Sequence, residues 1–552
     1  MSSSVDEADA VGGEVPTVDF DGRGLARAIA DLAHPRQVLP EAFRVATASV
    51  RAAFGKEVVD FPGRDRRFAD AAWQQNPFYR WWGQSYLAWS EALLRVAESP
   101  RLDVKNQLRA GYLARILTAA AAPPNVLTGN PAALKRALDT GGASLLRGAR
   151  NMTRDLVLNG GLPAQVDTRP FRVGENLACS PGAVVHREEM FEVLQYAPTT
   201  RDVRSRPLLI VPPQVNKHYI LDLAPGRSLI EFTVGQGVHT FCIVWRNPRR
   251  NSPDHGRWAL DDYVAAQLRA ADIVREITAS PDLNVLGVCA GGLTTALMLG
   301  HLAAGGDVRI HAASFLVTMI GSGPANLITA MAGPRTRRRV TRDAQRGAVY
   351  GHRALVRNFA FMRPADLVYS SAVNNWLLGD DPPAFDILAW NADASNISAA
   401  LNCDLLDIYA ENRAGRPGSL TVLGSSIDLR RVHCDTFVIA GSTDHITPWR
   451  PCYATSQLLG GHTEVVVTSS GHIQTIVNPL GKSRAAFRHG PAADADSDSW
   501  LDHADQRSGS WWPTWSDWLL TRSGDPRPAP DHLGTPAHPA AESAPGTYVF
   551  EN

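Results

Sequence analysis

A cysteine flanked by glycines carries the clearest chemical signal in the chain. Gly287-Val288-Cys289-Ala290-Gly291 has the form G-x-C-x-G; it ends the apolar run LNVLGV and precedes a run of small residues. A nucleophile on a tight turn between a strand and a helix needs glycines there, because larger side chains would clash. The free N–H groups at the start of the following helix would stabilise a thiolate. The pattern predicts a cysteine nucleophile at Cys289.

A thiol nucleophile needs a base, and two side chains further along the chain are placed to provide one. Asp444 follows the apolar run TFVIAG, and His472 follows the next such run, EVVVTS. α/β-Hydrolases supply their triad in the chain order nucleophile, acid, histidine, and a parallel sheet gathers the carboxyl ends of its strands at one edge. We therefore predict Cys289, Asp444 and His472 as catalytic residues. His445 is a rival base, but a side chain adjacent to Asp444 is poorly placed to be held by it.

Acyl chemistry also needs an oxyanion hole, built from two backbone N–H groups. One comes from the residue after the nucleophile, which is Ala290. The other is expected from PPQVNK, residues 212–217, which follows the apolar run PLLIV. Because prolines have no N–H group, Val215 or Asn216 is the expected donor. A rigid structural turn is the alternative interpretation of this segment.

The elements that must position these residues follow from the hydrophobic pattern. Short apolar runs bounded by turn residues alternate with helix-like segments, which indicates a mostly parallel, buried sheet. The predicted fold class is α/β, an α/β-hydrolase fold with an inserted cap and a helical amino-terminal domain. We expect strands at 207–211, 239–245, 283–288, 314–320, 436–441 and 464–469.

Changes in composition divide the chain into regions. We expect disorder over residues 1–20 and a mainly helical domain over 21–195 that ends in antiparallel strands. Residues 196–552 form the predicted catalytic domain. Within it, the stretch of about 321–430 interrupts the alternation of strands and helices and is expected to form a cap over the sheet edge. Residues 489–510 are expected to form a polar loop.

Composition excludes several classes of function. Lys+Arg 55 balances Asp+Glu 55, so the formal net charge of +0 gives no reason to expect a nucleic-acid partner. The six cysteines of the chain include no C-x-x-C pair, so we expect no metal site and a reducing compartment. No apolar run approaches the roughly 20 residues of a transmembrane helix. The acidic amino terminus lacks the apolar run of a signal peptide, and we expect a cytoplasmic protein.

Longer strings around these residues resemble the polyhydroxyalkanoate (PHA) synthases of the single-subunit type. The resemblance covers nearly the whole chain, and it includes the tail APGTYVFEN. The matching strings are NPFYRWWGQSYLAW, LLIVPPQVNKHYILDL, LNVLGVCAGG, VNNWLLGDDPPAFDILAWNADASN, AGSTDHITPW and SSGHIQTIVNP.

This resemblance implies an acyltransferase that polymerises 3-hydroxyacyl-CoA thioesters into polyester and releases CoA. It implies that Cys289 is the acylated nucleophile and His472 its base, while Asp444 either orients His472 or activates the 3-hydroxyl group. It implies no cofactor, since CoA is a leaving group of the substrate. It further implies a homodimer at the surface of polyester granules, together with granule-associated proteins. PPQVNK is closer to forms using medium-length acyl chains, whereas Ala290 differs from them, which leaves chain length open.

Two other functions are compatible with parts of the pattern. A cysteine thioesterase, esterase or PHA depolymerase of the same fold would use the same three residues and release free acid. A non-catalytic granule-coating protein would keep a vestigial site, and the ordered Cys289, Asp444 and His472 argue against it. Product analysis separates these alternatives.

Overall fold

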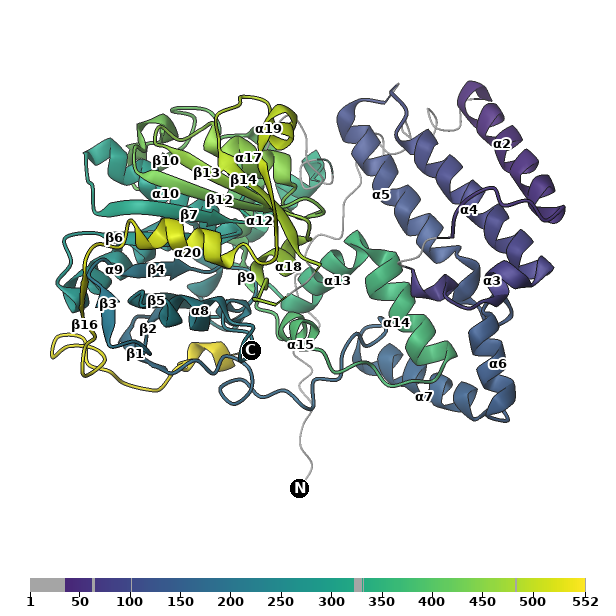
Figure 1. Cartoon of the computed structure of the whole chain (residues 1–552), viewed down its shortest axis with the longest axis horizontal. Helices are drawn as coiled ribbons and strands as arrows, with labels where there is room; N and C mark the ends of the chain where they lie inside the picture. The colour runs from purple at the N-terminus through teal and green to yellow at the C-terminus, as the bar shows by residue number, and fades with distance from the viewer. Residues whose placement is uncertain are drawn as a thin grey trace.

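The computed structural model describes residues 35–61, 65–100, 102–321, 330, 332–481 and 484–551. The disorder predicted for residues 1–20 lies outside the described residues. Figure 1 shows a central sheet flanked by helices on one side of the molecule and a separate group of amino-terminal helices on the other. The site predicted from sequence falls in the part that contains the sheet.

The amino-terminal region is helical, and polar caps fix where its helices begin. Asn76 and Asn130 each precede a proline, and their side chains accept hydrogen bonds from the amides of Phe78 and Ala133. Asp103 caps α5 in the same way. A polar cap followed by proline is a strong helix start. The helices are α2 (Pro35–Ala53), α3 (Ala72–Gln75), α4 (Pro77–Ala97), α5 (Val104–Ala120), α6 (Pro131–Asp139) and α7 (Ala143–Leu158).

Within the described residues, a ten-stranded sheet forms the centre of the remaining chain. Its inner strands run parallel, and the edge strands pair antiparallel. The predicted α/β architecture is therefore confirmed. In sheet order the strands are β1 (Gly182–Arg187), β2 (Phe191–Tyr196), β5 (Thr240–Trp245), β4 (Leu208–Val211), β6 (Leu283–Val288), β7 (Ile310–Leu316), β12 (Asp435–Gly441), β13 (Thr463–Thr468), β14 (Ala486–Pro491) and β15 (Asp505–Ser508).

Alternate strand residues pack against helices on opposite faces of the sheet. In β4, Leu209 and Val211 join a core that includes residues of α9 and α10, whereas Leu208 and Ile210 join a core with residues of α8 and α20. Because successive side chains of a strand point to opposite faces, burial of both faces requires a continuous apolar run. The helices around the sheet are α8 (Leu229–Gly235), α9 (Leu260–Thr278), α10 (Ala290–Gly305), α17 (Trp449–Ser456), α18 (His472–Ile476), α19 (Ser497–His503) and α20 (Trp512–Leu520).

The strand predicted at 314–320 is wrong in its limits. β7 begins at Ile310 and ends at Leu316. The next residue, Val317, has a φ of +45°, a left-handed conformation that β-branched residues rarely adopt. Its amide still donates to the Ile439 carbonyl of β12 at 2.7 Å, and the pairing with β12 goes no further. The strand therefore ends at a backbone irregularity that hydrophobicity alone does not reveal.

The antiparallel strands expected at the end of the helical domain extend the central sheet. β2 pairs with β5, so β1 and β2 share the sheet that carries Cys289. The carboxyl-terminal tail also lies against this edge, where the Val184 amide donates to the Glu542 carbonyl at 2.8 Å. The sheet thus begins before residue 196, the boundary expected from sequence.

Residues 489–510, expected as a polar loop, are mostly regular structure. β14 and β15 form an antiparallel pair at the sheet edge, and α19 lies between them in sequence. Trp500 of α19 is buried, and its Nε1 donates to the Pro491 carbonyl at 3.0 Å. The loop prediction is wrong because the side chains of an edge strand are largely solvated, so a polar sequence can still form a strand.

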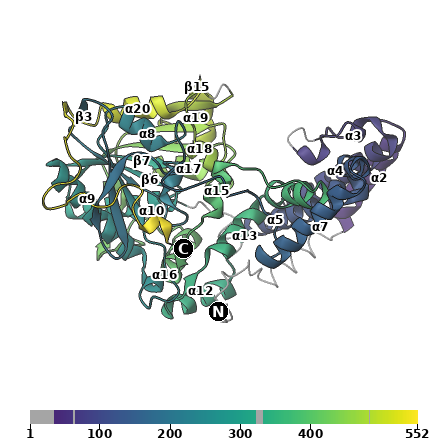
Figure 2. The same ribbon diagram turned by 90° about the horizontal axis from the view of Figure 1, so that it is seen from below.

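The chain leaves the sheet at the end of β7 and returns to it at β12, which pairs directly with β7. In Figures 1 and 2 the intervening helices α13, α14 and α15 lie between the sheet and the amino-terminal helices. We call residues 317–434 the insertion. Among its described residues the elements are α12 (Pro334–Gln345), β8 (Val349–Tyr350), α13 (His352–Met362), η7 (Ala365–Tyr369), α14 (Ser370–Ala372), η8 (Val373–Leu377), α15 (Asp386–Ala392), β9 (Ile397–Ser398), α16 (Ala399–Glu411), β10 (Thr421–Val422), β11 (Ser425–Ser426) and η9 (Leu429–Arg431).

The insertion packs closely against the amino-terminal helix α7. The Trp376 side chain donates through Nε1 to the Asp155 carboxylate at 2.8 Å. A Cβ atom added to Gly148 would lie 2.0 Å from the Trp376 carbonyl oxygen, so only glycine permits this approach. The insertion therefore joins the helical region to the sheet.

Candidate active site

Cys289 lies on a tight turn between β6 and α10. Its φ of +52° and ψ of −120° are unusual for a residue with a side chain. The Cys289 amide donates to the Leu316 carbonyl of the neighbouring β7 at 2.9 Å, and its carbonyl accepts from the Gly292 amide at 3.0 Å. The turn is therefore anchored on both sides. This strained turn from strand to helix is the geometry of a nucleophile elbow.

The elbow packs directly against the loop that follows β4. A Cβ atom added to Gly291 would lie 2.4 Å from the Pro212 carbonyl oxygen and 2.6 Å from that of Val211. Both distances are far shorter than van der Waals contact, and both involve backbone atoms with little freedom to move. Glycine at position 291 is therefore what allows the loop to reach the start of α10.

Asp444 and His472 meet at the same edge of the sheet, after the neighbouring strands β12 and β13. His472 is the first residue of α18, and its Nδ1 lies 2.7 Å from Asp444 Oδ2. The other carboxylate oxygen accepts from the amides of Ile446 and Thr447 at 2.8 and 3.0 Å. The Thr447 hydroxyl donates to Oδ2 at 2.8 Å. These hydrogen bonds fix the carboxylate so that it faces the imidazole.

Burial and charge have opposite effects on the pKa values of Asp444 and His472. Burial alone would raise the pKa of the Asp444 carboxyl, but the adjacent imidazole and the Thr447 hydrogen bonds hold it below its ordinary value. Burial would lower the pKa of His472, but the charges of Asp444 and Cys289, with hydrogen bonds to both, raise it to about 10. The imidazole is therefore hydrogen-bonded to the carboxylate and its pKa responds to the Cys289 charge, which links the three side chains.

The raised pKa of His472 predicts that stability depends on pH. Its folded-state value of about 10 lies above the ordinary value of 6.5, so the charged imidazole contributes fully below about pH 6.5. That contribution is lost as the pH rises towards the folded-state value. We expect the difference in free energy of unfolding between wild type and His472→Gln to shrink over this window, measured by chemical denaturation. A difference that does not change with pH would contradict the assignment.

His445, the rival base, does not share this arrangement. Burial lowers its pKa to about 4, although the Asp444 charge acts in the opposite direction. The charges of Arg363 and Asp366, both in the insertion, also act on its pKa. Because both Asp444 oxygens are already engaged by other donors, the geometry favours His472 as the base.

The loop of residues 212–217 is fixed to the first turns of α10. The Gln214 side chain donates through Nε2 to the Thr294 hydroxyl at 3.0 Å. The Gln267 side chain of α9 donates to the same hydroxyl at 2.5 Å. Both hydrogen bonds are buried. This loop is therefore part of the rigid surroundings of the elbow.

The two residues predicted as oxyanion donors lie at this contact. Ala290 is the first residue of α10, where the helix leaves its N–H groups without a partner four residues back. Val215 is half-buried in the facing loop, and the next residue, Asn216, has a φ of +72°. The left-handed conformation at Asn216 turns the chain sharply beside the elbow. Donation from Ala290 with Val215 or Asn216 stays a prediction.

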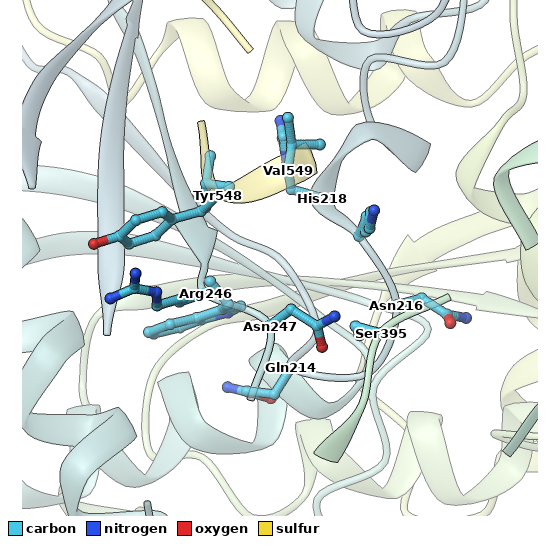
Figure 3. A pocket seen from close by; sticks show the side chains of 11 residues that line it. Gln214, Asn216, His218, Arg246, Asn247, Ser395, Tyr548 and Val549 are labelled. Atoms are coloured by element: carbon cyan, nitrogen blue, oxygen red, sulfur yellow. The ribbon is translucent and has the colours of Figure 1, made fainter. Parts of the chain in front are cut away.

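A small cavity lies behind this loop, and Figure 3 shows its lining. Its volume is about 20 Å³, comparable to the space that one water molecule needs. It is lined by Gln214 and Asn216 of the loop, Asn247 after β5, Ser395 of the insertion and Tyr548 near the carboxyl terminus. Four segments that are far apart in sequence therefore meet behind the loop.

Sequence reasoning missed several residues at the site. Thr447 did leave a signal, because an aspartate followed by a threonine three residues later is typical of a turn held by the aspartate side chain. Tyr409 is half-buried, and its hydroxyl donates to the Met319 carbonyl at 3.1 Å. Burial, and then the charge of Cys289, raises the pKa of Tyr409. It comes from helix α16 of the insertion, and no motif marked it.

Two known protein families match this chain, one in its amino-terminal part and the other over much of the sheet region. Residues 64–233 match the family described as Poly-beta-hydroxybutyrate polymerase (PhaC) N-terminus, and residues 227–479 match the alpha/beta hydrolase fold. The first match spans helices α3 to α7 and the strands β1, β2 and β4, and these three strands lie in the ten-stranded sheet. The fold and its elbow thus define an enzyme of the α/β-hydrolase fold.

Relatives that match most of the chain narrow the class further. The chain is 42% identical over 497 residues to Poly(3-hydroxyalkanoate) polymerase 1 of Ectopseudomonas oleovorans, covering 90% of this chain and 88% of that one. Polymerase 2 of the same organism is 44% identical over 491 residues, covering 88% and 86%. Poly(3-hydroxyalkanoate) polymerase subunit PhaC of Cupriavidus necator is 37% identical over 502 residues, covering 90% and 84%. The chain therefore belongs to the poly(3-hydroxyalkanoate) polymerase family, as the resemblance implied.

The surface of the amino-terminal helices is unusually apolar. Large side chains are exposed on α2 and α7, among them Phe43 at 74%, Leu146 at 77% and Val157 at 75%. Over the described ranges, the helices are too short or too polar to cross a membrane. The exposed apolar groups are therefore a surface feature of α2 and α7.

Proposed function

We propose that this chain polymerises (R)-3-hydroxyacyl-CoA thioesters into polyhydroxyalkanoate polyester, with Cys289 carrying the acyl group and CoA released. The observation that carries the proposal is the arrangement of Cys289 on the elbow with His472 and Asp444 at the same edge of the sheet. The chain that holds this site belongs to the poly(3-hydroxyalkanoate) polymerase family. We propose no resident cofactor, because CoA is part of the substrate and departs as a leaving group.

In the first step the thiol proton already resides on His472, whose raised pKa favours the charged imidazole, and the Cys289 thiolate attacks the thioester carbonyl carbon. A new carbon–sulfur bond forms, and the carbonyl oxygen becomes an oxyanion held by the Ala290 amide and the Val215 or Asn216 amide. The bond to the CoA sulfur then breaks. The CoA thiolate takes the proton from the His472 imidazolium, which leaves an acyl-thioester on Cys289.

The second step makes the polymer bond. A 3-hydroxyl group attacks the acyl carbonyl on Cys289, an ester bond forms, and the carbon–sulfur bond to Cys289 breaks. His472 accepts the hydroxyl proton, and Asp444 either orients His472 or helps to activate that hydroxyl. Either role of Asp444 needs its carboxylate beside the imidazole. Exchange of thioester for thioester keeps the acyl group activated, so formation of the ester is favourable.

The packing at Gly291 allows a test of the oxyanion loop. Gly291→Ala is expected to lower kcat for CoA release by roughly 100-fold or more, because the new methyl group displaces the loop that carries one donor. The matched control is Gly305→Ala at the end of the same helix, where a Cβ meets no atom within 4 Å. Equal losses in the two variants would count against this role for the loop.

Chain growth requires that water stay away from the acyl-thioester, since hydrolysis would end it. We propose that the insertion acts as the cap. The Cys289 charge acts on the pKa of Tyr409 in α16, and the charges of Arg363 and Asp366 act on the pKa of His445 beside Asp444. These effects support a covering position for the insertion.

We further propose that the chain acts as a homodimer in the cytoplasm, at the surface of polyester granules and with granule-associated proteins. The exposed apolar side chains of α2 and α7 support association of the helical region with a hydrophobic surface. Balanced net charge gives little electrostatic resistance to self-association.

One assay separates this function from its rivals. The purified chain is incubated with a 3-hydroxyacyl-CoA, thiol release is followed, and the product is analysed. Insoluble polyester supports the polymerase, and soluble 3-hydroxy acid supports a thioesterase, esterase or depolymerase of the same fold. Absence of CoA release would contradict the polymerase and the thioesterase and favour a granule-coating protein.

A further inference from the structure

The insertion holds the loop of residues 212–217 through a single carboxylate. Asp393, directly after α15, accepts a hydrogen bond from Lys217 Nζ at 2.6 Å and from the Tyr219 hydroxyl at 2.8 Å. Lys217 is the last residue of the loop, and its side chain is only 6% exposed. The insertion therefore supplies the counter-charge for a cation buried at the end of this loop.

A second contact from the same helix fixes the loop backbone. Trp390 Nε1 donates to the Lys217 carbonyl at 2.9 Å, and this hydrogen bond is buried. The preceding residue, Asn216, has the left-handed φ of +72°. Side chain and backbone of Lys217 are thus both held by α15 and the residue after it, so the orientation of the neighbouring peptide groups depends on the insertion.

Stability alone is a weak reason for such an ion pair. Lys217 is buried while the Asp393 side chain is 28% exposed, so desolvation of the lysine offsets much of the attraction, whereas removal of Asp393 leaves a buried charge uncompensated. A pair of this kind is better suited to fixing one arrangement of two segments. Here the segments are the insertion and the loop that contacts Gly291 at the start of α10.

We propose that Asp393 is a positioning residue that sets the oxyanion loop, so that the insertion completes the oxyanion hole when it is seated on the sheet. The inference rests on the proposed function, since it needs an oxyanion at Cys289. Ser395, two residues further on, lines the cavity behind the loop together with Gln214 and Asn216, as Figure 3 shows. The insertion therefore meets the loop from behind as well as at its end.

Two reactions of the same thiol distinguish positioning from general damage. Acylation by a 3-hydroxyacyl-CoA passes through an oxyanion, whereas alkylation by iodoacetamide displaces iodide from a saturated carbon and forms none. For Asp393→Asn we expect the single-turnover rate of CoA release to fall roughly 10- to 100-fold. The rate of Cys289 alkylation should stay within about twofold and KM within about threefold.

A matched control lies on the same helix. Asp386 of α15 also pairs with a basic residue of the sheet domain, Arg227 at 2.5 Å, but Arg227 lies outside the oxyanion loop. Asp386→Asn should leave both rates unchanged. Tyr219→Phe removes one hydrogen bond to Asp393 and keeps the charge pair, so it should slow acylation alone by a smaller factor. This variant carries the test if Asp393→Asn does not fold.

The possible outcomes are distinct. Loss of acylation and alkylation together in Asp393→Asn, or equal losses in Asp386→Asn, would overturn the positioning role in favour of general docking of the insertion. Wild-type rates of acylation in both Asp393→Asn and Tyr219→Phe would overturn the positioning role of Asp393. The proposed function would then remain intact. A wild-type chain that releases no CoA would overturn the proposed function, and this inference with it.

Discussion

Cys289→Ala is expected to reduce CoA release from a 3-hydroxyacyl-CoA by roughly 10⁵-fold, to the background rate. Alanine has no nucleophile, and the other elements of the site cannot form a covalent intermediate without one. Its smaller side chain fits the same backbone turn, so the free energy of unfolding should change by only about 1 kcal/mol. Thiol release and thermal unfolding, measured on the same preparation, check both expectations.

Two further cysteine variants sharpen this prediction. Cys289→Ser should retain at most a trace of activity, because a serine hydroxyl ionises far less readily and its oxoester gives up the activation that chain growth uses. Cys403→Ala is the matched control, since Cys403 is a half-buried thiol on α16 that contacts the Thr341 hydroxyl at 3.8 Å. It should keep full activity. Substantial polymerisation by Cys289→Ala would refute the covalent route.

Asp444→Asn is expected to lower kcat by roughly 10³- to 10⁴-fold with the fold retained. The carboxylate accepts from His472 Nδ1 at 2.7 Å and holds the tautomer that leaves Nε2 free for the thiol. An amide at this position can present its NH₂ group to Nδ1 and favour the wrong tautomer. The loss of negative charge also removes one of the causes that raise the pKa of His472.

The two roles implied for Asp444 give different kinetics in this variant. If the carboxylate orients His472, single-turnover acylation of Cys289 and chain growth should fall together. If it activates the 3-hydroxyl group, acylation should survive while elongation stops. His445→Gln serves as the control and should keep most activity. Full activity in Asp444→Asn, or a larger loss in His445→Gln, would contradict the assignment of the acid and base.

Local sequence patterns predicted the elements that carry the site because each pattern has a strong physical cause. Buried parallel strands require continuous apolar runs, and the elbow requires glycines around Cys289. These constraints placed Asp444 and His472 after the correct neighbouring strands. The same patterns failed where burial is one-sided or the backbone irregular, as at 489–510 and at Val317.

Contacts made by the insertion were outside the reach of local patterns. Asp393 and Lys217 are separated by 176 positions, and neither residue type at its own position signals the other. The Tyr409 hydroxyl likewise meets the Met319 carbonyl, 90 positions away, only through the fold of the insertion. Strand periodicity depends on near neighbours in sequence, whereas these contacts depend on how a long segment returns to the sheet.

The most direct test of the account is to identify the acylated residue. The wild-type chain is mixed with a 3-hydroxyacyl-CoA, quenched in acid during turnover, digested and examined by mass spectrometry. We expect one or more 3-hydroxyacyl units on the peptide containing Cys289, attached by a bond that neutral hydroxylamine cleaves. The Asp444→Asn and Cys403→Ala variants should carry any acyl group on that same peptide. CoA release with an unmodified Cys289, or with the acyl group on another residue, would contradict the account.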